Sequence, residues 1–100
     1  MKVRRVSKII KRWNQEKSEI NWTQYAYNCI KGRTKKHSGA FLFLVEDEEN
    51  DECRVIVELN NEKKSIDKKI KKTFATVTEA EQFLEKQKEI IELLIAIGVF

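Results

Sequence analysis

Histidine, cysteine and closely spaced carboxylates most often carry out chemistry in proteins, and this chain holds few of them. Its one histidine, His37, stands in the basic loop between Gly32 and Gly39, where neighbouring lysines favour loss of the ring proton. Cys29 and Cys53 match no zinc-ligand spacing. Glycine-rich phosphate loops and the metalloprotease motif do not occur. We therefore predict that the protein is not an enzyme, with no catalytic residue and no cofactor.

The densest group of acids lies at residues 46–52, which hold six carboxylates and no base. This stretch lacks the alternating ligands and central glycine of an EF-hand loop. Some nucleases carry a Glu-x-Lys pair on a strand, but here Glu58 is followed by Asn60 at the lysine position. We therefore expect no metal site, and we interpret the acids as a solvated turn that discourages association between sheet edges.

Positive charge is the stronger signal, because the net charge of +4 is sorted into blocks. Residues 1–37 hold eleven Lys/Arg against two acids, and residues 63–72 hold six lysines against one acid. Such blocks neutralise phosphates and release counterions. We predict nucleic-acid binding through phosphate contacts that read no bases, at Arg4, Arg5, Lys8, Lys11, Arg12, Arg33, Lys35, Lys36, Lys68, Lys69, Lys71 and Lys72.

Four aromatic residues of the basic half, Trp13, Trp22, Tyr25 and Tyr27, could stack on exposed bases. The alternative is that the tryptophans belong to the core, which we favour for both. Tyr27 lies off the apolar stripe of its predicted helix, so we expect it to be the freest of the four.

The elements that position these residues follow from hydrophobic spacing. Apolar residues at steps of three and four predict a basic amphipathic helix over about 2–14. A second helix is predicted over about 21–31, capped by Asn21 and ended by Gly32, with the stripe Trp22, Tyr25, Ala26, Cys29 and Ile30. A third begins at a capping box formed by Thr78 and Glu81 and ends at Gly98.

Two strands are predicted over 40–45 and 53–59, from a short apolar run and from an alternating pattern. Residues 64–76 fit either a strand or a helix, since apolar residues four apart share a face in both. We favour a strand over 66–75, because its end is rich in β-prone residues. The predicted fold class is α+β, in the order α-α-β-β-β-α, with a three-stranded antiparallel meander and helices packed on one face.

Two family resemblances accompany this order. The stretch KKIKKTFATVTEAEQFL resembles the strand-to-helix passage of AP2-like and integrase arm-binding domains, which implies a sheet laid on DNA. The order α-β-β-β-α from Asn21 onward is similar to that of the double-stranded RNA-binding domain. That family's Lys-Lys-x-Ala-Lys at the last helix is absent, and Glu79-Ala80-Glu81 stands there instead. No functional residue is transferred from either family.

The carboxyl end suggests a different function, because nine of the eleven residues in 90–100 are apolar. One sheet face cannot cover all of them, so the rest is either covered by the two N-terminal helices or left exposed for a partner or a second copy. The predicted contacts are Ile91, Leu94, Ile95 and Phe100. The alternative function is therefore a protein-binding inhibitor or adaptor, for example one encoded by a phage or mobile element that blocks a host or defence enzyme. It would bind a charged protein partner through the apolar carboxyl end, the acidic turn at 46–52, or both.

The length of 100 residues and the 41% hydrophobic content predict one folded domain over 1–100. Two free cysteines and the lack of a signal peptide indicate the cytoplasm. No apolar stretch reaches the roughly 18 residues that span a bilayer, and the apolar face of the first helix is narrow. We expect no membrane partner and no small-molecule ligand, and a monomer or a homodimer formed through the last helix.

Overall fold

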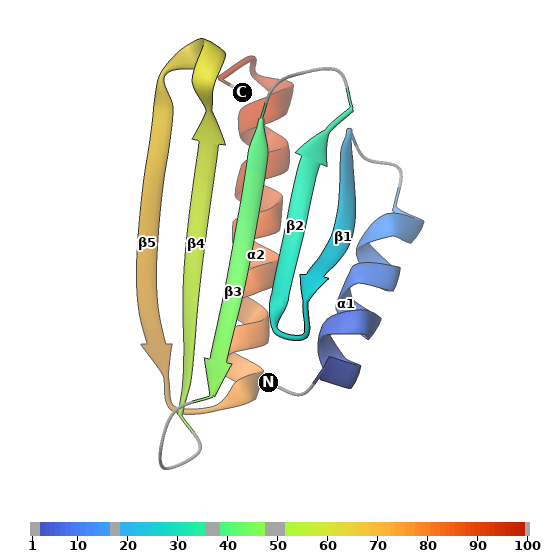
Figure 1. Ribbon diagram of the computed structural model, residues 1–100, viewed down its shortest axis with the longest axis vertical. Coiled ribbons are helices and arrows are strands. Elements are labelled where there is room, and N and C mark those ends of the chain that lie inside the picture. The colour runs from blue at the N-terminus through green and yellow to red at the C-terminus, as the bar shows by residue number, and fades with distance from the viewer. Residues whose placement is uncertain (1–2, 17–18, 36–38, 48–51, 100) are drawn as a thin grey trace.

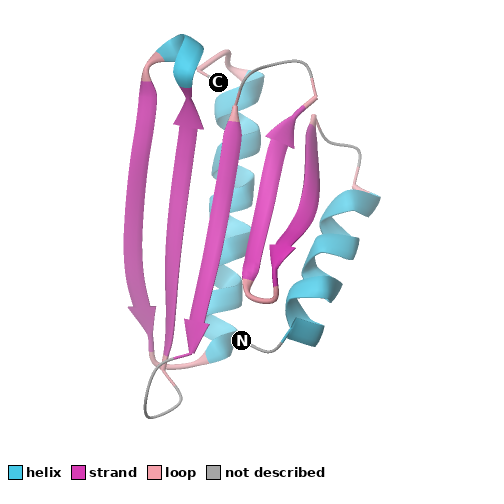
Figure 2. Ribbon diagram, viewed as in Figure 1, coloured by secondary structure: helices cyan, strands magenta, loops and turns pink. Residues whose placement is uncertain are grey.

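The protein is an α+β fold built on a five-stranded antiparallel sheet (Figures 1 and 2). The computed structural model describes residues 3–16, 19–35, 39–47 and 52–99. Strand order follows chain order, β1-β2-β3-β4-β5. The elements are α1 (Val3–Gln15), β1 (Ile20–Ala26), β2 (Cys29–Thr34), β3 (Ala40–Asp47), β4 (Cys53–Asn61), the short 3-10 helix η2 (Glu62–Lys64), β5 (Ile66–Phe74) and α2 (Val77–Ala96).

The predicted fold class is confirmed, but the meander has five strands where three were predicted. The helix predicted over 21–31 is wrong, because that segment forms the β1–β2 hairpin, with Trp22 paired opposite Gly32. Burial alternates at the start of β1, where Ile20 and Trp22 are buried and Asn21 and Thr23 are exposed, as period-two packing requires. Tyr25, placed on the apolar stripe of the predicted helix, is 68% exposed.

This correction also removes the α-β-β-β-α order from Asn21 on which the second family resemblance depended. The local composition explains the strands, since tryptophan, threonine and tyrosine favour a pleated, half-buried surface. The turn between the strands lies at Tyr27 and Asn28, and asparagine tolerates turn geometry.

The other predicted elements are present with small shifts. The ambiguous stretch 64–76 contains β5, as the strand interpretation predicted. The N-cap of the last helix is Thr76, two residues before the predicted cap Thr78. Its hydroxyl accepts a hydrogen bond from Glu79 N at 3.2 Å. Gly98 follows that helix with a φ of +82°, a left-handed conformation that suits glycine after a helix end.

Both helices pack on the same face of the sheet, as predicted for the helices of this fold. In Figure 1 β3 passes in front of α2, while α1 lies beside β1. The core between helices and sheet centres on Trp22, which stacks on Phe43 with ring centroids 5.6 Å apart and lies 4.8 Å from Trp13 of α1. Further core residues are Val6, Ile9, Ile30, Phe41, Val45, Val55, Val57, Leu59, Ala80, Leu84 and Ile91.

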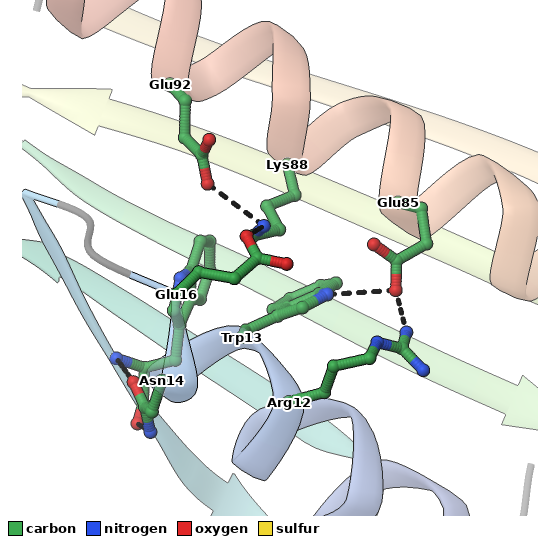
Figure 3. A network of polar contacts seen from close by, with 8 residues as sticks. Arg12, Trp13, Asn14, Glu16, Glu85, Lys88 and Glu92 are labelled. Carbon is green, nitrogen blue, oxygen red and sulfur yellow. Dashed lines mark hydrogen bonds and ion pairs between the residues drawn. The ribbon is translucent and has the colours of Figure 1, made fainter.

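Polar contacts join the two helices across this core (Figure 3). Lys88 of α2 is only 3% exposed and pairs with Glu16, next to the end of α1, and with Glu92 at 3.1 Å. Trp13 Nε1 donates to Glu85 at 3.0 Å, and Arg12 pairs with the same carboxylate. A lysine can be buried in this way because carboxylates compensate its lost hydration.

Burial alone acts to lower the pKa of Lys88. The hydrogen bonds and charges of Glu16 and Glu92 outweigh that effect, so the pKa stands above its ordinary value of 10.5. Lys88 is therefore charged at neutral pH and fixes α2 against the end of α1. Among the described residues, neither helix has the length and apolar content needed to span a membrane.

Candidate nucleic-acid interface

The face of the sheet opposite the two helices, here called the outer face, is the candidate binding surface. Strand alternation fixes which side chains it carries, since the neighbours of each buried residue point the other way. One row of partners runs across it from Lys31 to Leu42, Glu58 and Lys69. The next row runs through Cys29, Leu44, Ile56 and Lys71.

The centre of the outer face is apolar. Leu42 and Leu44 of β3 are half-buried, and Ile56 of β4 is 8% exposed. Cys29 is buried beside them, and burial together with the charge of Glu58 raises the pKa of its thiol, an effect that Lys31 partly opposes. A thiol held in its protonated form is a poor nucleophile and a poor metal ligand.

Cations flank this apolar centre on both sides. Lys31 and Arg33 come from β2, and Lys69 and Lys71 come from β5. The two strands lie three strand spacings apart in the sheet, or about 14 Å at about 4.8 Å per spacing. Three of these cations, Arg33, Lys69 and Lys71, belong to the set predicted from the sequence.

Carboxylates share the outer face and reduce its positive charge. Glu58 lies 3.5 Å from Lys69, and Glu46 pairs with Arg54. Asp67 stands opposite Asn60 at the end where β5 begins. Exposed pairs of this kind are weak, so Lys69 can exchange Glu58 for a phosphate at little cost.

At the same end of the sheet, Arg33 also lines a hollow of about 340 Å³. Its wall includes both charged and polar groups, among them Lys63, Glu62 and Asn60. The hollow lies where β2 and β4 end and β3 begins, and it brings Lys63 and Glu62 of η2 to that end of the sheet.

The aromatic residues separate into two groups, as the exposure of their rings shows. Trp13 and Trp22 are 0% and 1% exposed and belong to the core. Tyr25 and Tyr27, in the β1–β2 hairpin, are 68% and 66% exposed. The ammonium of Lys31 lies 5.0 Å from the centroid of the Tyr25 ring, which places that ring on the outer face next to the cations of β2.

The remaining predicted phosphate contacts lie on other surfaces. Lys8 and Lys11 are exposed on α1, whereas Arg12 is engaged with Glu85. Lys68 and Lys72 alternate to the helix side of β5, and Lys72 lies over the rings of Phe74 and Phe83. Lys35 is exposed just beyond β2. Arg4 and Arg5 belong to α1 without described side chains, and Lys36 and His37 lie outside the described residues.

The predicted cations are therefore divided among the outer face, the helix side of β5 and α1, with β5 at the far edge of the sheet from β1. Lys31 was missed as a site residue because the segment around it was assigned to a helix. Strand alternation over 29–34, with Ile30 buried and Lys31 outward, is the signal that would have found it.

The predicted protein-binding residues also need correction. Ile91 is completely buried in the core, so it cannot contact a partner in the folded chain. Leu94 and Ile95 are partly buried against the same core, and Phe100 lies outside the described residues. The side chains that α2 and its end expose instead are Ile90, Leu93, Ile97 and Val99.

Within the described ranges, no group of three histidine, cysteine or acidic side chains is placed to hold a metal ion. Most of the acidic stretch 46–52 falls at residues 48–51, outside those ranges. Comparison with protein-family models, with curated proteins and with solved structures finds no match to this chain.

Proposed function

We propose that this protein binds nucleic acid through the outer face of its sheet and acts by binding, without catalysis. Lys31 and Arg33 on one side and Lys69 and Lys71 on the other contact phosphates. The observation that carries this proposal is the arrangement of these four cations on two sides of an apolar centre. Charged phosphates are attracted to the sides, and the less polar parts of the ligand lie on the centre.

The expected affinity depends strongly on salt. Each phosphate contact with a single strand contributes roughly −0.7 to the slope of log affinity against log salt concentration, so four contacts give a slope of roughly −3. Binding is thus expected at low salt and is largely lost at a few hundred millimolar.

Two double variants with the same change in charge test which surface binds. Arg33→Gln with Lys71→Gln removes one cation from each side of the outer face. Lys8→Gln with Lys11→Gln removes two exposed cations from α1. Fluorescence anisotropy with a labelled oligonucleotide at low salt is expected to show about a fivefold to thirtyfold loss for the first pair, from roughly 0.5–1 kcal/mol per contact.

The salt slope of the first pair is also expected to become less steep by about 1.4. The second pair should lose no more than about threefold, since its cations act only through long-range attraction. Equal losses for the two pairs would show that the outer face is not the site, and no complex with the unmodified protein at low salt would remove the proposal.

A reciprocal change tests the same surface by gain of affinity. Glu58 lies between Leu42 and Lys69 on the outer face, so Glu58→Gln removes a repulsive charge and frees a lysine. It should strengthen binding about threefold, whereas Glu89→Gln, an exposed site on α2, should have a smaller effect.

A second candidate function, binding of another protein chain, is favoured by a different observation. Ile90 and Leu93 of α2 and Ile97 at its C-cap follow one another at helical spacing and are 42%, 61% and 64% exposed. A row of apolar side chains with this spacing is a typical helix-docking surface. An adaptor or inhibitor would use this row and leave the outer face unoccupied, so variants of the two surfaces separate the two functions.

A further inference from the structure

We propose that the nucleic acid bound on the outer face is single-stranded and that Tyr25 stacks on one of its bases. This inference rests on the proposed function and specifies the ligand of the same surface. It depends on two features that phosphate contacts alone do not require, namely the apolar centre of the outer face and an exposed aromatic ring beside one of its cations.

The apolar centre distinguishes single strands from duplexes. Leu42, Leu44 and Ile56 lie between the cations of β2 and those of β5. In a duplex the faces of the bases are hidden in the stack, so this centre would meet phosphates or the polar edges of a groove. A single strand can turn its bases toward the sheet and keep its phosphates at the flanking lysines.

Tyr25 supplies a specific stacking surface. Its ring is 68% exposed, so it contributes little to the core, and it stands where the pairing of β1 with β2 is irregular, between Gln24 and Ala26. Tyr25 follows Thr23, the partner of Lys31, by two residues, so strand alternation directs its side chain to the outer face. A flat ring held on the surface accepts the face of any base without regard to sequence.

The contact between Tyr25 and Lys31 joins the two kinds of recognition. The Lys31 ammonium lies 5.0 Å from the ring centroid, a distance at which a cation is attracted to the ring. A base stacked on Tyr25 therefore brings its own backbone close to Lys31. Arg33 stands two residues further along β2, on the same face, and offers a cation for the adjoining phosphate.

Anisotropy titrations with three labelled ligands of one mixed sequence test the proposal: single-stranded DNA, single-stranded RNA, and the DNA duplex. At least one of the single strands is expected to bind tenfold or more tightly than the duplex. Tyr25→Ala is expected to weaken single-strand binding about fivefold to a hundredfold. Tyr25→Phe, which keeps the ring, should bind within about twofold of the unmodified protein.

Because Tyr25 is exposed, both variants should unfold at the same urea concentration as the unmodified protein, which separates a binding effect from a folding effect. Duplex binding as tight as single-strand binding overturns the inference, as does unchanged affinity in Tyr25→Ala. If the duplex alone binds and depends on Arg33 and Lys71, the proposed function stands and the single-strand inference falls. If none of the three ligands binds, the proposed function itself fails.

Discussion

Gly32 of β2 has no side chain, and this allows the ring of Trp22, on the neighbouring strand β1, to lie over β2. Trp22 of β1 pairs opposite Gly32, and its ring covers the glycine. A Cβ atom at this position would lie 2.5 Å from Trp22 Cζ3 and 3.0 Å from Ile20 Cγ2. Cβ atoms in proteins do not approach non-bonded heavy atoms as closely as 2.5 Å. The Trp22 ring cannot move away, because the Phe43 ring stacks on it with the two ring centroids 5.6 Å apart.

We therefore expect Gly32→Ala to lower the free energy of unfolding by about 1–3 kcal/mol, the usual cost of overpacking a core. Urea denaturation followed by tryptophan fluorescence measures this change. The smaller ring of Trp22→Phe should relieve the contact, so Gly32→Ala should cost less in a Trp22→Phe background than in the unmodified protein. Equal costs in the two backgrounds would mean that the ring is not what requires glycine.

Single residues also show what the sequence alone could not settle at the candidate site. Arg33, Lys69 and Lys71 were identified as cations, but nothing in their types distinguishes them from Lys68 and Lys72. Strand register makes that distinction, because adjacent residues of β5 point to opposite faces. The residues of the outer face can therefore be identified only from the pairing of the strands.

Elements whose hydrophobic pattern fits only one kind of secondary structure were predicted well, whereas the β1–β2 hairpin was not. In α1 and α2 the apolar spacing indicates a helix, and in β4 the alternation of Val55, Val57 and Leu59 with polar neighbours at Arg54 and Glu58 indicates a strand. Trp22, Ala26 and Cys29 also follow steps of three and four, so a helix was equally compatible locally. The observed contact that requires strands is the one between the Trp22 ring and Gly32. A single helix over this segment would not bring these two residues together.

The ion pairs between α1 and α2 lead to a prediction at the scale of the elements. Lys88 is buried with Glu16 and Glu92 as its partners, and Lys88→Met keeps its length while removing its charge. We expect a loss of about 1–3 kcal/mol in the free energy of unfolding. This is smaller than for fully buried pairs, because Glu16 and Glu92 side chains are 50% and 36% exposed and can reach water.

The pH dependence of that difference has a defined sign. The pKa of Lys88 in the folded protein lies above the 10.5 of an unperturbed lysine, so the folded state retains this proton better than the unfolded state. The stabilisation is complete from neutral pH up to 10.5 and declines as pH rises through the folded pKa. Urea titrations should therefore show the two proteins converging above pH 10.5.

Lys86→Met is the matched control for this prediction, since Lys86 is exposed on the same helix. It should change the free energy of unfolding by no more than about 0.5 kcal/mol and should follow the unmodified protein at every pH. A Lys88→Met protein as stable as the unmodified one would show that the ion pairs of Lys88 do not contribute to holding α1 against α2.

At the scale of the whole molecule, the two faces of the sheet carry different groups. One face carries both helices and the core, and the outer face carries the flanking cations of the proposed site. The lysines of β5 also lie along an edge strand, where charged side chains oppose pairing with the edge of another sheet. We therefore expect that any self-association proceeds through α2 and not through the β5 edge of the sheet.

The size of the apolar row on α2 limits how strong such self-association can be. Ile90, Leu93, Ile97 and Val99 are each only partly exposed. The apolar area that four such side chains expose falls within the range of the largest apolar patch on an ordinary monomer, about 300–600 Å². It falls short of the about 800 Å² that each partner buries in a standard interface. We predict a monomer at micromolar concentration and a weak dimer that appears only as concentration approaches the millimolar range.

Sedimentation equilibrium over that range tests the prediction with two variants that add the same charge to α2. Leu93→Lys places a cation in the middle of the exposed row, so it should abolish dimerisation. Gln82→Lys adds its cation at an exposed position outside the row and should leave association unchanged. A tight dimer at micromolar concentration, or equal effects of the two lysines, would show that the contact surface lies elsewhere. Because Leu93 is far from the outer face, nucleic-acid binding by Leu93→Lys should be at least as tight as in the unmodified protein.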